Sequence, residues 1–109
     1  MTVIYKVYKT DGTINKVEKE GDEVELNHLY ELIDCDIVEA VRFTDYKMFV
    51  DENGILKGRK VNSEGSWRWY EKCNLNPMRT QPLVGTVVEV IRGEMKWNLQ
   101  KKNYGDYGE

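Results

Sequence analysis

The sequence predicts a single compact α+β domain, in which a mostly antiparallel sheet of about five strands carries two short helices. Three observations lead to this prediction. Short apolar runs with the two-residue period of strands are separated by Asp-Gly and Asn-Gly turn signals. Two further segments place apolar residues at helical spacing, and 109 residues suit one domain better than two. We expect this domain over residues 1–93, followed by a partly flexible C-terminal extension over residues 94–109.

The N-terminal segment is predicted to form a β-hairpin. Residues 3–8 alternate as a strand does, Asp11 and Gly12 form a strong hairpin signal, and residues 13–19 supply the return strand. The apolar residues of the return strand do not share one face, so we expect it at the edge of the sheet. The acidic residues 21–25 then form a loop.

The first helix is predicted from apolar residues at helical spacing over residues 26–33, with Asn27 as its N-cap. A helix of about two turns is not stable alone, because nucleation is costly, so its apolar stripe must pack on the sheet. Residues 37–43 and 47–50 are predicted strands, and three side chains of the first should share one face: Ile37, Val41 and Phe43.

Later elements follow from turn and capping signals. Asn53-Gly54 predicts a turn after which Ile55 and Leu56 pair back briefly. Asn62 or Ser63 is expected to cap a second helix that ends near residue 74. Residues 83–91 form the most apolar run, which indicates a central strand, and Gly85 within it indicates a bulge or a close approach. Residues 95–102 could form a further short helix.

Charge is distributed unevenly along this acidic chain, whose formal net charge is −3. Residues 1–56 contain six basic and thirteen acidic residues, whereas residues 57–79 contain six basic and two acidic residues. One basic segment on an acidic molecule is a local electrostatic feature. The acidic balance of the whole chain argues against binding to nucleic acid, since such proteins are basic over the contact face.

Composition also bears on compartment and cofactors. No stretch approaches the roughly 18–20 apolar residues of a membrane span, and N-terminal lysines interrupt any signal-peptide core, so we expect a cytoplasmic protein that binds no membrane. Cys35 and Cys73 lack metal-ligand spacing and are expected to be reduced thiols. With His28 as the single histidine, we expect no zinc site, and we expect no other metal or cofactor.

The order of motifs through the chain resembles a family of short proteins of unknown function found in bacteriophages, mobile elements and some large DNA viruses. The motifs are a Leu-rich helix, a strand that opens with Ile-Val-Glu, a hydrophobic strand that runs into Asp-Glu-Asn-Gly, an Asn, and a Val-Gly strand. The segments that carry them are residues 29–33, 37–39, 48–58, 61–62 and 83–88, and the resemblance covers residues 1–92.

Two positions depart from the family pattern, one at a helix start and one at a turn. Gly65-Ser66 stands where Ala-Thr is usual, and Cys35-Asp36 stands where Gly-Gly is frequent. The resemblance implies an accessory protein of viral or mobile-element origin that acts on a host system, in the host cell cytosol. It implies no catalytic residues.

The basic segment is the first candidate for function. Aromatic side chains interleaved with cations suit a flat anionic ligand, and a helix start offers free N–H groups to an anion. Trp67 and Tyr70 share one helix face while Arg68 and Lys72 share another, so the alternative is that the aromatics simply dock the helix and the helix start is a capped surface turn. The residues that we predict to bind a ligand are Arg59, Lys60, Asn62, Ser66, Trp67, Arg68, Trp69 and Arg79.

Other constellations are weaker. His28 lies near carboxylates in the sequence, but no nucleophile accompanies it, so we expect no enzyme. The acidic residues 18–25 could bind a cation or mimic nucleic acid, or form a solvated loop. Aromatic residues of the C-terminal extension could anchor a partner protein.

The resemblance and the basic segment together predict a non-catalytic protein that binds and sequesters a small anionic, nucleotide-type host ligand in a counter-defence role. We expect a homo-oligomer, because a small domain encloses a ligand best between copies. The alternative is an inhibitor or regulator of a host protein, which would bind through the acidic N-terminal face or the aromatic tail.

Overall fold

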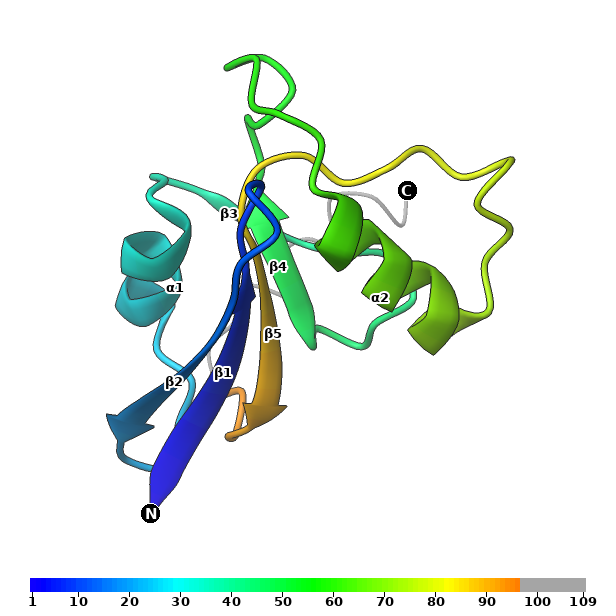
Figure 1. Cartoon of the computed structure of the whole chain (residues 1–109). Coiled ribbons are helices and arrows are strands. Elements are labelled where there is room, and N and C mark those ends of the chain that lie inside the picture. The colour runs from blue at the N-terminus through cyan, green and yellow to red at the C-terminus, as the bar shows by residue number, and fades with distance from the viewer. Residues whose placement is uncertain (97–109) are drawn as a thin grey trace, which may run out of the picture.

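A computed structural model describes residues 1–96 and confirms an α+β fold built on one five-stranded antiparallel sheet, in the order β2-β1-β5-β4-β3 (Figure 1). The hairpin and the second helix form as predicted, and the apolar C-terminal run lies in the centre of the sheet. The elements are β1 (Thr2–Tyr8), β2 (Ile14–Glu20), α1 (Leu26–Ile33), β3 (Val38–Ala40), β4 (Met48–Asp51), α2 (Ser63–Cys73) and β5 (Val87–Arg92).

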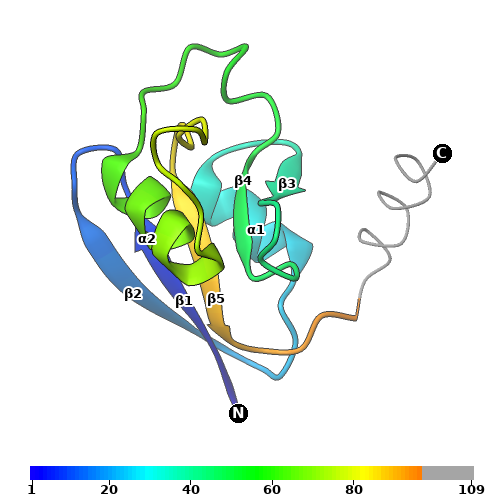
Figure 2. The same ribbon diagram turned by 90° about the vertical axis from the view of Figure 1, so that its right-hand side faces the viewer.

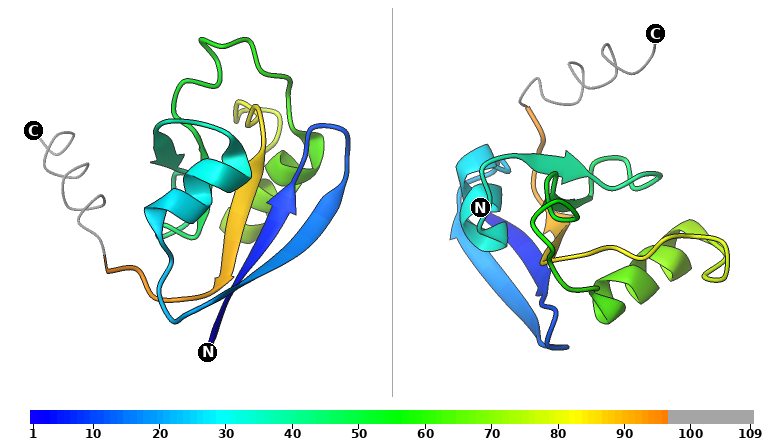
Figure 3. Two further views of the ribbon diagram at one scale, coloured as in Figure 1. Left: turned by 90° about the vertical axis from the view of Figure 1, so that its left-hand side faces the viewer. Right: turned by 90° about the horizontal axis from the view of Figure 1, so that it is seen from above.

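The two helices cover opposite faces of the sheet, so the domain has three layers. Figure 2 views the sheet from the α2 side, and the left view of Figure 3 shows it from the α1 side. Alternation along each strand divides the core accordingly. The α1 side contains Val3, Tyr5, Leu29, Ile33, Phe49, Val88 and Val90, and the α2 side contains Tyr8, Met48, Val50, Trp69, Tyr70 and Val87.

Gly85 permits the close approach that its place in the sequence predicts. Its φ is +75°, and a Cβ there would lie 2.8 Å from Cδ of Arg59. The approaching group is therefore an arginine side chain. Strand β5 begins only at Val87, because this left-handed residue interrupts the extended run.

The first helix and the strand after it differ from the prediction. The N-cap of α1 is Glu25, without a side-chain cap hydrogen bond, so the prediction of Asn27 is wrong. Strand β3 has only three residues, and Ile37 and Phe43 are exposed, so the apolar face predicted for residues 37–43 is also wrong. Phe43 is 70% exposed and has a φ of +69°, which places it in a tight connecting loop.

Ile55 and Leu56 do not pair back on β4. They lie in a series of turns, and Leu56 is 87% exposed. Strand β4 already has β3 on one side and β5 on the other, so it has no free edge for the returning chain. The turns over residues 52–58 form a protruding loop, which is visible above the sheet in Figure 1.

Ordered contacts continue past residue 93. The N–H of Glu94 donates to the carbonyl of Asp22, and its carbonyl accepts from the N–H of Val24. Met95 packs against the α1-side core. Met95 and Lys96 are not helical, and the rest of the helix predicted over residues 95–102 lies outside the described residues, as does most of the predicted extension.

Candidate functional site

Two of the predicted ligand-binding residues are buried and bonded to backbone. Asn62 is the N-cap of α2, as predicted: its Oδ1 accepts from the N–H of Gly65 at 2.8 Å. Its Nδ2 donates to the carbonyls of Tyr8 and Gly85, also at 2.8 Å. Ser66 Oγ accepts from the N–H of Leu83 at 2.8 Å. Both side chains join α2 to the sheet and the segment before β5.

The two tryptophans of α2 have different environments. Trp69 is buried and its Nε1 donates to the carbonyl of Arg42 at 2.9 Å. Trp67 is 56% exposed, and its ring meets that of Tyr70 edge-on at 5.7 Å. Lys60 and Arg79 are exposed. The helix therefore uses Trp69 for packing and presents Trp67 to solvent.

Arg59 is held by a buried carboxylate. Its Nε donates to Asp51 Oδ2 at 3.0 Å, and a terminal nitrogen donates to the carbonyl of Asp34 at 2.8 Å. Lys57 Nζ lies 2.9 Å from the same Oδ2. Arg59 thus ties the protruding loop to the end of β4 and to the turn after α1.

A second buried carboxylate, Glu89 in the centre of β5, contacts polar side chains from β1 and α2. The hydroxyl of Tyr8 donates to its Oε1 at 2.8 Å. Arg68 Nε lies 3.1 and 3.2 Å from its two oxygens, and Arg68 donates again from a terminal nitrogen to Oε2 at 3.0 Å. Lys72 Nζ lies 3.7 Å from Oε2. One carboxylate therefore faces two cations.

Beside Glu89, two lysines lie directly opposite each other on neighbouring strands. Lys6 of β1 pairs with Lys16 of β2 and, on its other side, with Glu89. The N–H of Lys9 donates to the carbonyl of Thr13, and antiparallel pairs alternate, so Lys6 and Lys16 form a non-hydrogen-bonded pair with Cα atoms about 4.5 Å apart. Like charges in that position are destabilising.

These residues together form a basic face, which we define as Lys6, Lys16, Arg68 and Lys72. The carboxylates that pair with them are Glu89 and Glu18, whose carboxylate lies 3.3 Å from Lys16. Lys6 Nζ lies 5.7 Å from the centre of the Tyr8 ring. Glu71 acts on Arg68, and Glu20 lies further along the same side of β2.

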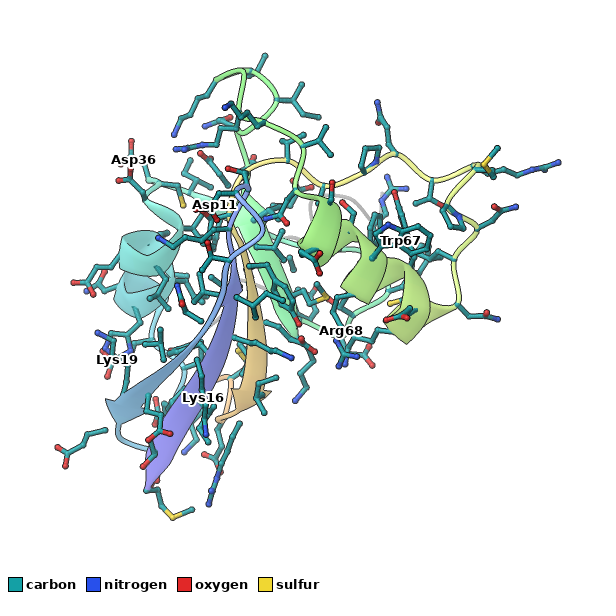
Figure 4. The ribbon with its side chains drawn as sticks, viewed as in Figure 1. Asp11, Lys16, Lys19, Asp36, Trp67 and Arg68 are labelled. Carbon is teal, nitrogen blue, oxygen red and sulfur yellow. The ribbon has the colours of Figure 1, made fainter. Side chains whose placement is uncertain are left out.

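Figure 4 shows how the labelled side chains relate to this face. Arg68 and Trp67 leave different sides of α2, and Lys16 and Lys19 leave β2 toward different sides of the sheet. Of the predicted ligand-binding residues, the structure places Arg68 on the basic face. Lys6 and Lys16 were not among the predicted residues. They stand equally far along the sequence from Asp11 at the hairpin turn, and this spacing is the signal that indicates their pairing across the two strands.

Both buried carboxyl groups have lowered pKa values. Burial alone would raise the pKa of Glu89, but hydrogen bonds from Arg68 and Tyr8 outweigh it. Burial is likewise outweighed at Asp51, where hydrogen bonds from Lys57, the N–H of Asn53 and Arg59 lower the pKa. The pKa of Tyr8 is raised, first by burial and then by its bond to Glu89, so its hydroxyl stays a donor.

These lowered pKa values predict acid sensitivity. A carboxyl whose folded pKa lies below its unfolded value of about 4 contributes stability that is complete above that value and is lost as the pH falls through the folded pKa. We expect the free energy of unfolding, measured with urea from about pH 7 to about pH 3, to fall below about pH 4.5. Asp51→Asn and Glu89→Gln should each flatten the curve, and an unchanged curve in both would contradict the assignment.

Other features of the described chain are separate from the basic face. A hollow of about 350 Å³ is lined by Met1, Thr2, Asp22, Arg92, Gly93 and Glu94. Asp22 belongs to the acidic residues 18–25, and none of the six is a predicted ligand-binding residue. Within residues 1–96, no helix is long and apolar enough to cross a membrane, and no group of three or more His, Cys, Asp or Glu could hold a metal ion. Cys35 and Cys73 are free thiols, and burial raises the pKa of each, that of Cys35 to about 11.

The fold and the basic face define a small α+β domain with helices on both faces of one sheet and a group of four cations beside α2. The chain belongs to the family described as domain of unknown function DUF3846, which matches residues 1–102. This agrees with the resemblance to a family of unknown function, while the viral or mobile-element origin stays a prediction. No curated protein and no solved structure matches the chain.

Proposed function

We propose that this protein is non-catalytic and binds a small anionic ligand of nucleotide type on the basic face. The observation that carries the proposal is the direct pairing of Lys6 with Lys16 on one face of the sheet. Lys6 Nζ lies over the Tyr8 ring and Lys16 Nζ lies beside Glu18, so the two ammonium groups turn away from each other. A phosphate between the two side chains would draw both toward it and replace this like-charge pair with two charge-assisted hydrogen bonds.

Arg68 and Lys72 extend the same site. They share Glu89, so one carboxylate balances two cations, and their side chains remain 40% and 31% exposed. A guanidinium that is held in place by a buried carboxylate keeps free N–H groups for a second acceptor, because it has five donors in a fixed plane. An anion with two or more phosphate groups suits this arrangement best.

The biological role rests on the resemblance alone. A viral or mobile-element accessory protein that sequesters a nucleotide-type host signal in the cytoplasm would act against a host defence. In that role the protein needs affinity for its ligand and no chemistry. A small domain with its site on an open face would hold such a ligand best as an oligomer.

Native mass spectrometry of the protein purified from cells, before and after denaturation, is the test. We expect a released nucleotide-type mass, and we expect Lys6→Gln/Lys16→Gln to weaken binding of that compound about tenfold or more, since two charge-assisted contacts are lost. Lys19→Gln is the matched control, because Lys19 lies on β2 but on the α1 side.

Two outcomes would count against the proposal. A protein that is purified free of ligand, and that binds neither pyrophosphate nor a panel of ribonucleotides and cyclic dinucleotides, would favour the alternative of a host-protein inhibitor. Equal weakening by Lys19→Gln would indicate a general charge effect and no defined site.

A further inference from the structure

Strand β2 has one free edge in the described chain. Among residues 1–96 it pairs with β1 alone, and it lies at the border of the sheet (Figures 2 and 3). The opposite border is β3, which has three residues against the seven of β2. An edge of seven residues is long enough to template another strand, whereas a very short edge is protected.

The backbone groups on that free edge follow from the hairpin. Lys9 and Thr13 form a hydrogen-bonded pair, so in β2 the odd-numbered residues bond to β1. The N–H and C=O groups of Ile14, Lys16, Glu18 and Glu20 therefore point away from β1. The edge offers donors and acceptors at alternate residues over the whole length of the strand.

The side chains of β2 are complementary to those of a second, antiparallel copy. With the twofold axis at Val17, Lys16 of each copy lies opposite Glu18 of the other, on the same side of the sheet. Val17 then meets its own copy on the other side, where its side chain is half-buried. Opposite charges directly across an antiparallel pair are stabilising.

Neighbouring registers are not complementary. An axis at Lys16 places two lysines opposite each other, and an axis at Glu18 does the same for two glutamates. Like charges directly opposite each other are destabilising. A shift of the register by one residue would put the α2 side of one copy on the same side of the joined sheet as the α1 side of the other. The arrangement centred on Val17 is therefore the one that pairs the whole of β2 with its copy and opposes no like charges.

We propose that the protein forms a homodimer through antiparallel pairing of β2 with β2 of a second copy, centred on Val17, to give one continuous ten-stranded sheet. A twofold axis perpendicular to the sheet leaves both α2 helices on the same side. Lys16 of one copy and Lys16 of the other then lie on a diagonal, about 7–8 Å apart between strands.

The two basic faces become neighbours in this dimer. If the proposed anion binding holds, the lysine pairs on either side of the axis form one site, and a ligand with phosphates at both ends would bridge the copies. This part depends on the proposed function, whereas the dimer itself does not.

The test is sedimentation of the purified protein without added ligand, over a range of concentrations. Pairing of single strand edges buries less than the roughly 1,600 Å² of a standard interface, so the monomer–dimer equilibrium should depend on concentration. Lys16→Glu and Glu18→Lys should each give a monomer, because each places like charges opposite each other. The double variant K16E/E18K should restore the dimer, since the exchanged charges are again complementary.

Controls separate this proposal from the proposed function. Both exchanged positions are exposed, so circular dichroism should show each variant folded. Lys6→Gln should weaken anion binding and leave the dimer intact, while Lys19→Gln should change neither. A wild-type protein that is monomeric at every concentration would overturn the proposed interface. The same holds if the double variant is monomeric like the two single variants.

Discussion

Replacing Asn62 with alanine should lower the free energy of unfolding by about 3–5 kcal/mol. The side chain is fully buried and makes three hydrogen bonds to backbone groups, at the start of α2, the end of β1 and Gly85. Alanine would leave two carbonyls and one N–H without their partner, at about 1–3 kcal/mol for each buried group that water does not reach. The lost N-cap is part of this cost.

Urea denaturation followed by circular dichroism would measure this loss. Ser63→Ala is the matched control, because Ser63 is the next residue, is exposed, and should change stability by no more than about 0.5 kcal/mol. A loss below about 1 kcal/mol for Asn62→Ala would show that the three groups find other partners.

Replacing Glu89 with alanine should lower the free energy of unfolding by about 3 kcal/mol. The substitution removes the buried carboxylate that Arg68 and Lys72 share, and the acceptor of the Tyr8 hydroxyl. Removing one member of a buried ion pair costs more than the pair contributes, because the remaining charge is uncompensated. Breaking a buried ion pair costs about 3–5 kcal/mol, and the partial exposure of both cations places the effect of Glu89→Ala at the lower end of that range.

A double-mutant cycle with Arg68→Ala would isolate the interaction. We expect the double variant to be less destabilised than the sum of the single variants, with a coupling of about 1–3 kcal/mol. Glu20→Ala is the control for loss of a glutamate from the same sheet at an exposed position. Equal effects of Glu89→Ala and Glu20→Ala would contradict the proposed role of the buried carboxylate.

Turn and capping residues in the sequence correctly predicted those elements that depend on residues close together along the chain. The Asp11-Gly12 turn defines the hairpin, and Asn62 caps α2, because each depends on residues within a few positions along the chain. The predicted strand over residues 37–43 was wrong beyond its centre. Ile37 and Phe43 lie outside the three residues of β3 and are exposed, and the left-handed φ at Phe43 ends the extended run.

The candidate site was predicted only in part. Arg68 was expected to bind an anion, and its place on the basic face agrees with that expectation without testing it. Arginine and tryptophan are common at ligand sites. Here, however, Arg59 pairs with Asp51, and Trp69 donates to a backbone carbonyl. The sequence shows an arginine or a tryptophan and does not show which group it meets.

By itself, the sequence determined the class of fold, the hairpin, the capped second helix and the apolar strand at the centre. These depend on periodicity and on turn residues, which act over short distances. Only the tertiary structure decided that Lys6, Lys16 and Glu89 lie in one row and that α2 places Arg68 and Lys72 over it. The reason is that a strand's neighbours are set by long-range register, and β1 and β5 meet across some eighty residues of chain.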